Sequence, residues 1–305
     1  MSERPSILSR VGLTLFVLLV MLVTGTVAAM VGLAITDNLL FVTALTWALA
    51  APILLFSGPR LMGLGHRTMG TRQDRDAPQR PRYLIGTLLG LGLVLLPALV
   101  GRLAGGYQPM PGADLALLQA PSGTAALPAI VYTLPALMLS AAGEELLFRG
   151  VLLRLWQPVL KAKGALVLSA LFFVAVHAGN PGADPRGALG VFIAGIALGA
   201  LFLARGDLWM VAGAHLGWNM GEALVIGVPV SGFTLPSLAR WQVVDSELWQ
   251  GLLGGSFGPE EGLLFHGALG LAAVAGLVFA AAHGAFADPG GHEAGGSVDP
   301  IASPD

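Results

Sequence analysis

Apolar segments long enough to cross a lipid bilayer recur along the chain and limit the folds open to it. A transmembrane helix needs about 20 mostly apolar residues. The candidate segments are Val11–Ile35, Leu39–Ser57, Leu84–Val100, Leu127 to about Leu160, Gly164–His177, Ala188–Ala204, Leu208–Ile226 and Gly262–His283. The sequence therefore predicts an all-α, polytopic integral membrane protein with about eight transmembrane helices.

The composition points to the same class of protein. Hydrophobic residues make up 55% of the chain and charged residues only 11%, whereas soluble domains carry about 25% charged residues. The net charge of −2 argues against a protein that binds nucleic acid. The chain has no cysteine, which excludes disulfides, thiolate chemistry and cysteine-bound metals.

The basic residues predict an orientation. Eight helices with alternating loops place thirteen of the sixteen basic residues on one side, leaving only Arg102, Arg186 and Arg240 on the other. Because basic loops stay in the cytoplasm, both termini are predicted to be cytoplasmic. The first segment follows Arg4 and Arg10 as a signal peptide would, but its apolar run is too long for one. Residues 1–286 are predicted to form a single transmembrane domain, and residues 287–305 a disordered tail.

Two adjacent carboxylates stand at the end of a long apolar run. An ionised side chain at mid-membrane costs roughly 2.5–3.5 kcal/mol on insertion scales. Glu145 and Arg149 are four residues apart, so on a helix they share a face and can pair. Glu144 is rotated about 100° from that face and is a candidate reactive carboxylate. In the alternative interpretation, the three charges form a solvated cytoplasmic helix end.

Two later segments also carry polar residues that are rare inside membranes. His177 ends its segment, and Phe173 lies four residues earlier on the same face. His215 and Asn219 share a face of their segment by the same spacing, and glycines beside His215 would let a neighbouring helix approach closely. These residues could join helices together, but three such segments in one chain favour a shared site.

Glu222 extends the polar face of the same segment. It lies seven residues after His215, which is close to two full helical turns. We expect this carboxylate to support the site by orienting His215 or Asn219. The alternative is that Glu222 meets solvent near the outer end of the helix.

The long loop Val228–Glu261 ends in a pattern typical of a helix start. Gly258 and Pro259 are followed by Glu260 and Glu261, so two acids would stand at the positive end of the helix dipole. We expect them to stabilise the first turn of the last segment.

The polar residues together resemble a known family. The motifs, in order, read Glu144-Glu145-Leu-Leu-Phe-Arg149, Phe173-Val-Ala-Val-His177 and His215-Leu-Gly-Trp-Asn219. This order and spacing is similar to that of the CPBP family of intramembrane proteases, which includes type II CAAX prenyl endopeptidases and bacterial bacteriocin-processing and self-immunity proteins. The resemblance covers residues 127–228, and it implies an integral protein of the bacterial plasma membrane.

The resemblance also implies an activity and roles for the residues. It implies hydrolysis of a peptide bond within the membrane, with Glu144 and His177 activating a water molecule. His215 and Asn219 would stabilise the oxyanion, while Glu145 and Arg149 hold the site in place. The implied partners are the bilayer and a membrane-tethered peptide or protein, including prenylated substrates of the CAAX type.

Whether a metal takes part is open at this stage. Glu144, His177 and His215 form a plausible zinc-binding set, but the chain lacks a His-Glu-x-x-His sequence. We therefore expect no metal and keep zinc as the alternative. Two further functional alternatives are an ion-coupled transporter that uses the same polar residues and a catalytically silent membrane scaffold.

Overall fold

The computed structural model describes residues 6–35, 39–61, 69–70, 79–110 and 122–286. The structure is 79% helical with very little strand, as the sequence predicts. The helices are α1 (Ile7–Ile35), α2 (Leu39–Leu61), α3 (Gln79–Leu103), α5 (Leu127–Glu145), α6 (Arg154–His177), α7 (Pro185–Arg205), α8 (Leu208–Met220), α9 (Glu247–Leu253) and α10 (Leu263–Ala282). The predicted disordered tail, residues 287–305, lies outside the described residues.

The predicted count of eight transmembrane helices is not confirmed. The described residues contain five helical segments that are long and apolar enough to cross a membrane: Ile7–Gly32, Pro81–Leu103, Gly123–His177, Pro185–Arg205 and Leu263–Ala282. Val42–Ser57 is apolar but shorter. The helix that begins at Leu208 also falls short, because its α-helical part has only 13 residues.

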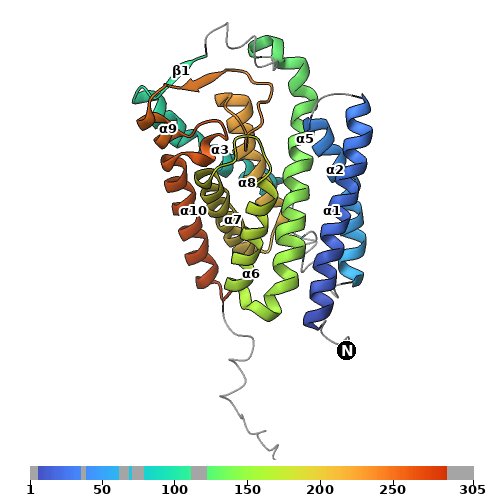
Figure 1. The fold of residues 1–305 in the computed structure, drawn as a ribbon. Coiled ribbons are helices and arrows are strands. Elements are labelled where there is room, and N and C mark those ends of the chain that lie inside the picture. The colour runs from blue at the N-terminus through green and yellow to red at the C-terminus, as the bar shows by residue number, and fades with distance from the viewer. Residues whose placement is uncertain (1–5, 36–38, 62–68, 71–78, 111–121, 287–305) are drawn as a thin grey trace, which may run out of the picture.

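The longest of these segments contains a reversal of chain direction. Gly123–His177 has 55 residues, which at 1.5 Å per residue exceeds the thickness of a bilayer. The backbone turns at Lys161, whose φ of 56° and ψ of 175° are not helical. After this turn α6 runs back beside the preceding helix (Figure 1), and the Ser169 hydroxyl donates to the Phe148 carbonyl at 2.9 Å. The turn falls in the predicted gap between Leu160 and Gly164.

Two stretches of this helical framework widen into π-helices. The first, Leu146–Leu153, follows α5 directly, and the second, Gly221–Ile226, follows α8. π-helical turns are rare and are frequently found at functional sites. Both stretches here carry or adjoin the ionisable residues singled out from the sequence.

Helices α3 and α8 pack backbone against backbone through four glycines. A Cβ atom at Gly86 or Gly90 would lie about 2 Å from the carbonyl oxygen of a residue in α8, and one at Gly213 or Gly217 would meet carbonyl oxygens of α3 equally closely. Such small-xxx-small pairs allow tight helix contacts within membranes. As a result, α3 holds the helix that carries the second histidine in place.

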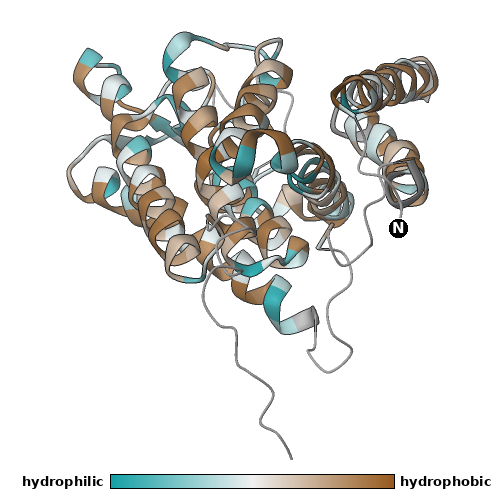
Figure 2. Cartoon of the chain, turned by 90° about the horizontal axis from the view of Figure 1, so that it is seen from below, coloured by the Kyte–Doolittle hydropathy of each residue, from teal (hydrophilic) through white to brown (hydrophobic). Residues whose placement is uncertain are grey.

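Helices α1 and α2 lie to one side of the other helices (Figure 2). Helix α1 is joined to α6, because the Trp156 indole donates to the Thr14 hydroxyl at 3.0 Å and Arg10 donates to the Leu155 carbonyl. Trp47 of α2 packs on Gly143, where a Cβ atom would come within 2.4 Å of the indole. The α1–α2 pair thus covers the back of the helix segment that carries the two glutamates.

A small cap closes the end of the bundle where α8 ends and α10 begins. Strand β1 (Tyr107–Pro109) pairs antiparallel with β2 (Trp241–Val243), and α9 follows beside them (Figure 1).

The helix start predicted at Gly258–Glu261 is corrected in its position. α10 begins only at Leu263, after the short 3₁₀ turn Pro259–Glu261. The Glu261 carboxylate accepts from the backbone N–H groups of Gly255 and Phe257 at 2.6 and 2.9 Å, so it holds the preceding loop.

Candidate active site

A buried ion pair forms the base of the site. Oε1 of Glu145 accepts from Nη1 of Arg149 at 2.9 Å, and both side chains are fully buried. The guanidinium also donates to the Gly195 carbonyl at 3.1 Å and lies 4.8 Å from the centre of the Phe173 ring. The same Oε1 is 2.8 Å from Nδ1 of His215. Glu145 therefore links the first π-helical turn to α8.

Glu144 points away from this pair and keeps one oxygen free. Its Oε1 accepts from the Ser140 hydroxyl at 2.9 Å, one helical turn earlier. Its Oε2 has no hydrogen-bond partner in the described part of the chain and lies 3.9 Å from Nε2 of His215. The side chain is 16% exposed, whereas that of Glu145 is 0% exposed. Glu144 is thus the more exposed of the two carboxylates, although its unpartnered Oε2 is itself buried.

His177 presents its Nε2 atom, because its other nitrogen is occupied. Nδ1 donates to the Phe173 carbonyl at 2.8 Å, which leaves Nε2 as the acceptor of the neutral ring. The Phe173 ring packs between the two histidines, with centroids 4.5 Å from His177 and 5.9 Å from His215. The Phe-x-x-x-His spacing thereby separates the two imidazoles with an apolar spacer.

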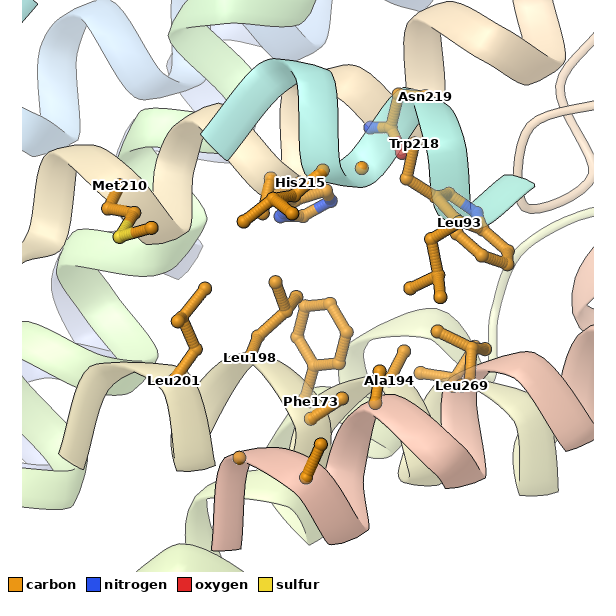
Figure 3. A pocket seen from close by; sticks show the side chains of 18 of the residues that line it. Leu93, Phe173, Ala194, Leu198, Leu201, Met210, His215, Trp218, Asn219 and Leu269 are labelled. Carbon is orange, nitrogen blue, oxygen red and sulfur yellow. The ribbon is translucent and has the colours of Figure 1, made fainter. Parts of the chain in front are cut away.

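These residues adjoin an apolar cavity of about 430 Å³. His177, His215 and Asn219 line it together with mainly aliphatic residues of α3, α7, α8 and α10. Figure 3 shows Phe173, Ala194 and Leu198 on the wall that faces His215 and Trp218. The Asn219 side chain makes no hydrogen bond with any described residue, so its amide is available to a ligand. Glu144 does not line the cavity itself and reaches it through His215.

Glu222 is fully buried at the end of α8. Its side chain is 0% exposed, so the alternative in which it meets solvent is wrong. α8 widens into a π-helix at Gly221, and the angular count that predicted one polar face assumes a regular α-helix. The carboxyl of Glu260 and the indole of Trp218 lie close enough to the Glu222 carboxyl to interact with it electrostatically. Its predicted role in orienting His215 or Asn219 stays a prediction.

The zinc alternative gains no support from the geometry. Within the described ranges, no group of three or more His, Asp or Glu side chains is arranged to hold a metal ion. The candidate ligands Glu144, His177 and His215 do not form such a group among the described residues.

Three polar residues of the site were not anticipated from the sequence. Ser140 carries a weak local signal, because it lies four residues before Glu144 in an apolar helix. Ser231 and Glu260 line the cavity from the long loop, and no spacing rule connects that loop to α8. Only the folded loop brings them to the site.

A comparison with protein-family models bears on the motif-bearing helices. Residues 126–221 match the family described as Type II CAAX prenyl endopeptidase Rce1-like. The match confirms the predicted resemblance over this part of the chain and contains all four predicted catalytic residues, whose roles it does not test. No curated protein and no solved structure matches the chain. The Rce1-like segment extends from just before α5 to the end of α8, so α1–α3 and α10 lie outside it.

Proposed function

We propose that this chain is an intramembrane endopeptidase that hydrolyses a membrane-tethered peptide or protein without a metal. One observation carries the proposal: His177, His215 and Asn219 line one apolar cavity, and Glu144, from a third helix, lies 3.9 Å from His215. The Rce1-like match over residues 126–221 supports a protease of the CAAX type. Sites of hydrolysis combine a base, an oriented water molecule and donors for the developing oxyanion.

Glu144 acts as the general base in this proposal. Ser140 holds its Oε1 and leaves Oε2 for a water molecule. His177 contributes a free Nε2 in the cavity wall, which can accept the second hydrogen bond of that water. The attacking oxygen would then add to the scissile carbonyl carbon, its proton passing to Glu144 and later to the leaving amine.

His215 and Asn219 stabilise the oxyanion. With Nδ1 donating to Glu145, a proton on Nε2 makes His215 a cation between two glutamates and a donor towards the cavity. The Asn219 amide N–H is a second donor. Preorganised donors of this kind typically contribute about 10²–10³ in rate each. Glu145 and Arg149 hold the His215 ring in the orientation that this requires.

The cavity suits a substrate that approaches within the bilayer. Its wall is mainly aliphatic and includes residues of α3, α7 and α10, which are long and apolar enough to cross a membrane, so an extended peptide carrying a prenyl chain is the candidate substrate class. The distribution of basic residues predicts that the α7–α8 turn is cytoplasmic, and we propose cleavage from that side of a bacterial plasma membrane.

The test uses the full chain in lipid nanodiscs and a library of farnesylated peptides with varied C-terminal residues, with products identified by mass spectrometry. We expect cleavage by the wild type and none by Glu144→Gln, which retains an acceptor for Ser140. The activity should survive strong chelators. Cleavage by Glu144→Gln at the wild-type rate, or loss on chelation with recovery on adding zinc, would overturn the mechanism. No cleavage of any peptide by the wild type would overturn the substrate class.

A further inference from the structure

A second pair of buried carboxyls lies at the far end of the cavity from the α7–α8 turn. Glu260 is 4% exposed and Glu222 is 0% exposed. The two side chains act on each other's charge, although one lies on α8 and the other on the loop before α10. Neither belongs to the Rce1-like segment, and the proposed reaction uses neither.

Glu260 faces the cavity with one oxygen unused. Its Oε1 accepts from the hydroxyl and the backbone N–H of Ser231 at 2.6 and 3.2 Å. Its Oε2 is buried and has no hydrogen-bond partner among the described residues. Ser231 and Glu260 line the same cavity as His215 and Asn219. The carboxyl is therefore held at one oxygen in the cavity wall, and its other oxygen is covered by protein on the side of Gly258.

The pair has no positive counterpart in the described part of the chain. No ion pair joins Glu222 or Glu260 to a basic side chain of the described residues. The nearby Arg240 instead donates to the carbonyls of Gly227 and Leu235. Both oxygens of Glu222 also lack a hydrogen-bond partner of ordinary geometry among the described residues. Buried carboxylates without a counter-charge are costly, and they are ordinarily paired or protonated.

We propose that this end of the cavity is a specificity subsite for a positively charged group, an ammonium or guanidinium, on the substrate peptide. The inference rests on the proposed function and adds a preference that the function does not imply. The bound cation would pair with the Glu260 carboxylate at the cavity wall, and the buried Glu222 carboxyl would add negative potential from behind it. Asn219 lines the same wall, so the charged group would lie within a few residues of the scissile bond.

The test measures binding without turnover. Fluorescent farnesylated peptides carrying lysine, arginine or uncharged norleucine at each position near the C-terminus are titrated against the Glu144→Gln variant in nanodiscs. We expect lysine or arginine at one position to lower the Kd about tenfold or more relative to norleucine, as a buried charge-assisted hydrogen bond predicts. Adding Glu260→Gln should bring the two Kd values to within about twofold, with the norleucine peptide unaffected.

The matched control is Glu247→Gln, which removes an exposed negative charge from α9 on the same side of the protein. It should keep the full lysine preference. The subsite would be overturned if Glu260→Gln and Glu247→Gln showed the same preference for lysine over norleucine. It would also be overturned if the parent Glu144→Gln variant showed no such preference at any peptide position. If Glu260→Gln does not purify as a folded protein, Glu222→Gln takes its place and should reduce the preference at least threefold.

The outcomes also separate the subsite from the proposed protease activity. A lysine preference that disappears in Glu260→Gln supports the subsite even if the wild type cleaves none of the peptides. Conversely, cleavage by the wild type with equal Kd values for lysine and norleucine peptides supports the protease and removes the subsite.

Discussion

The two buried acidic pairs of this protein differ in how their charge is balanced. Glu144 and Glu145 are surrounded by Arg149, His215 and the Ser140 hydroxyl. Among the described residues, the neighbours of Glu222 and Glu260 are the uncharged side chains of Ser231, Trp218 and Tyr107 and the two carboxyls themselves. The first pair can stay ionised in an apolar environment because its neighbours carry the opposite charge. The second has no cation beside it among the described residues, so its charge is relieved by a proton or by a cation that binds from outside. This difference is why we propose chemistry at the first pair and recognition at the second.

The largest expected effect comes from the balanced pair, which is Glu144 and Glu145; Glu222 and Glu260 form the unbalanced pair. Glu144→Gln should lower the cleavage rate by about 10²–10⁴-fold, the usual contribution of a general base, because an amide cannot accept the proton of the water. Glu222→Gln should change the rate less than tenfold. Rates on the same farnesylated peptide measure both. Equal losses in the two variants would contradict the division of roles.

Removing the cation from the balanced pair should destabilise the fold. Arg149→Met leaves Glu145 buried without its partner, and breaking a buried pair in this way costs about 3–5 kcal/mol. Arg186→Met, which removes an exposed partner of Asp184, is the control and should cost less than about 1 kcal/mol. Thermal unfolding in detergent measures both. Adding Glu145→Gln to Arg149→Met should recover part of the loss; further destabilisation would argue against the pair.

The α3–α8 contact holds the helix that carries His215 and can be tested separately. At Gly90 a Cβ atom would lie 1.9 Å from the Ala214 carbonyl oxygen, whereas at Gly92 nothing lies within 4 Å. Gly90→Ala should therefore destabilise the protein by about 1–3 kcal/mol and reduce activity, because the helices must separate. Gly92→Ala should be neutral or slightly stabilising. Similar melting temperatures for the two variants would show that the close packing is unimportant.

A further expected effect is a pH dependence of stability to which Glu260 contributes. Burial raises the pKa of Glu260 to about 7 from an ordinary value of 4.5. Folding therefore favours the protonated form. The contribution to stability is full below about pH 4.5 and declines as the pH rises through about 7, by at most about 1.4 kcal/mol per pH unit. Melting temperatures between pH 5 and 8 should show this decline, and Glu260→Gln should flatten it. An unchanged slope in Glu260→Gln would place the titrating group elsewhere.

Local spacing was sufficient to predict the balanced pair but not the unbalanced one. Glu145 and Arg149 are four residues apart, and their contact forms within one helical run. Glu222 and Glu260 are separated by a loop that folds over the end of the bundle. Periodicity along one helix carries no information about such a loop. For the same reason the pattern around Pro259 indicated a helix start, whereas the acids there hold loop backbone and line a cavity.

The sequence by itself determined that the chain is helical and membrane-embedded, which residues are candidates for chemistry, and which of them share a helical face. These properties follow from hydrophobicity and from the 3.6-residue repeat, both of which are local. The tertiary structure alone decided that Glu145 bridges Arg149 and His215, that α3 rather than a helix of the Rce1-like segment packs against α8 through glycines, and that Glu222 meets Glu260. Each of these depends on how separate helices approach one another, and that approach is set by side-chain size and burial across the whole bundle.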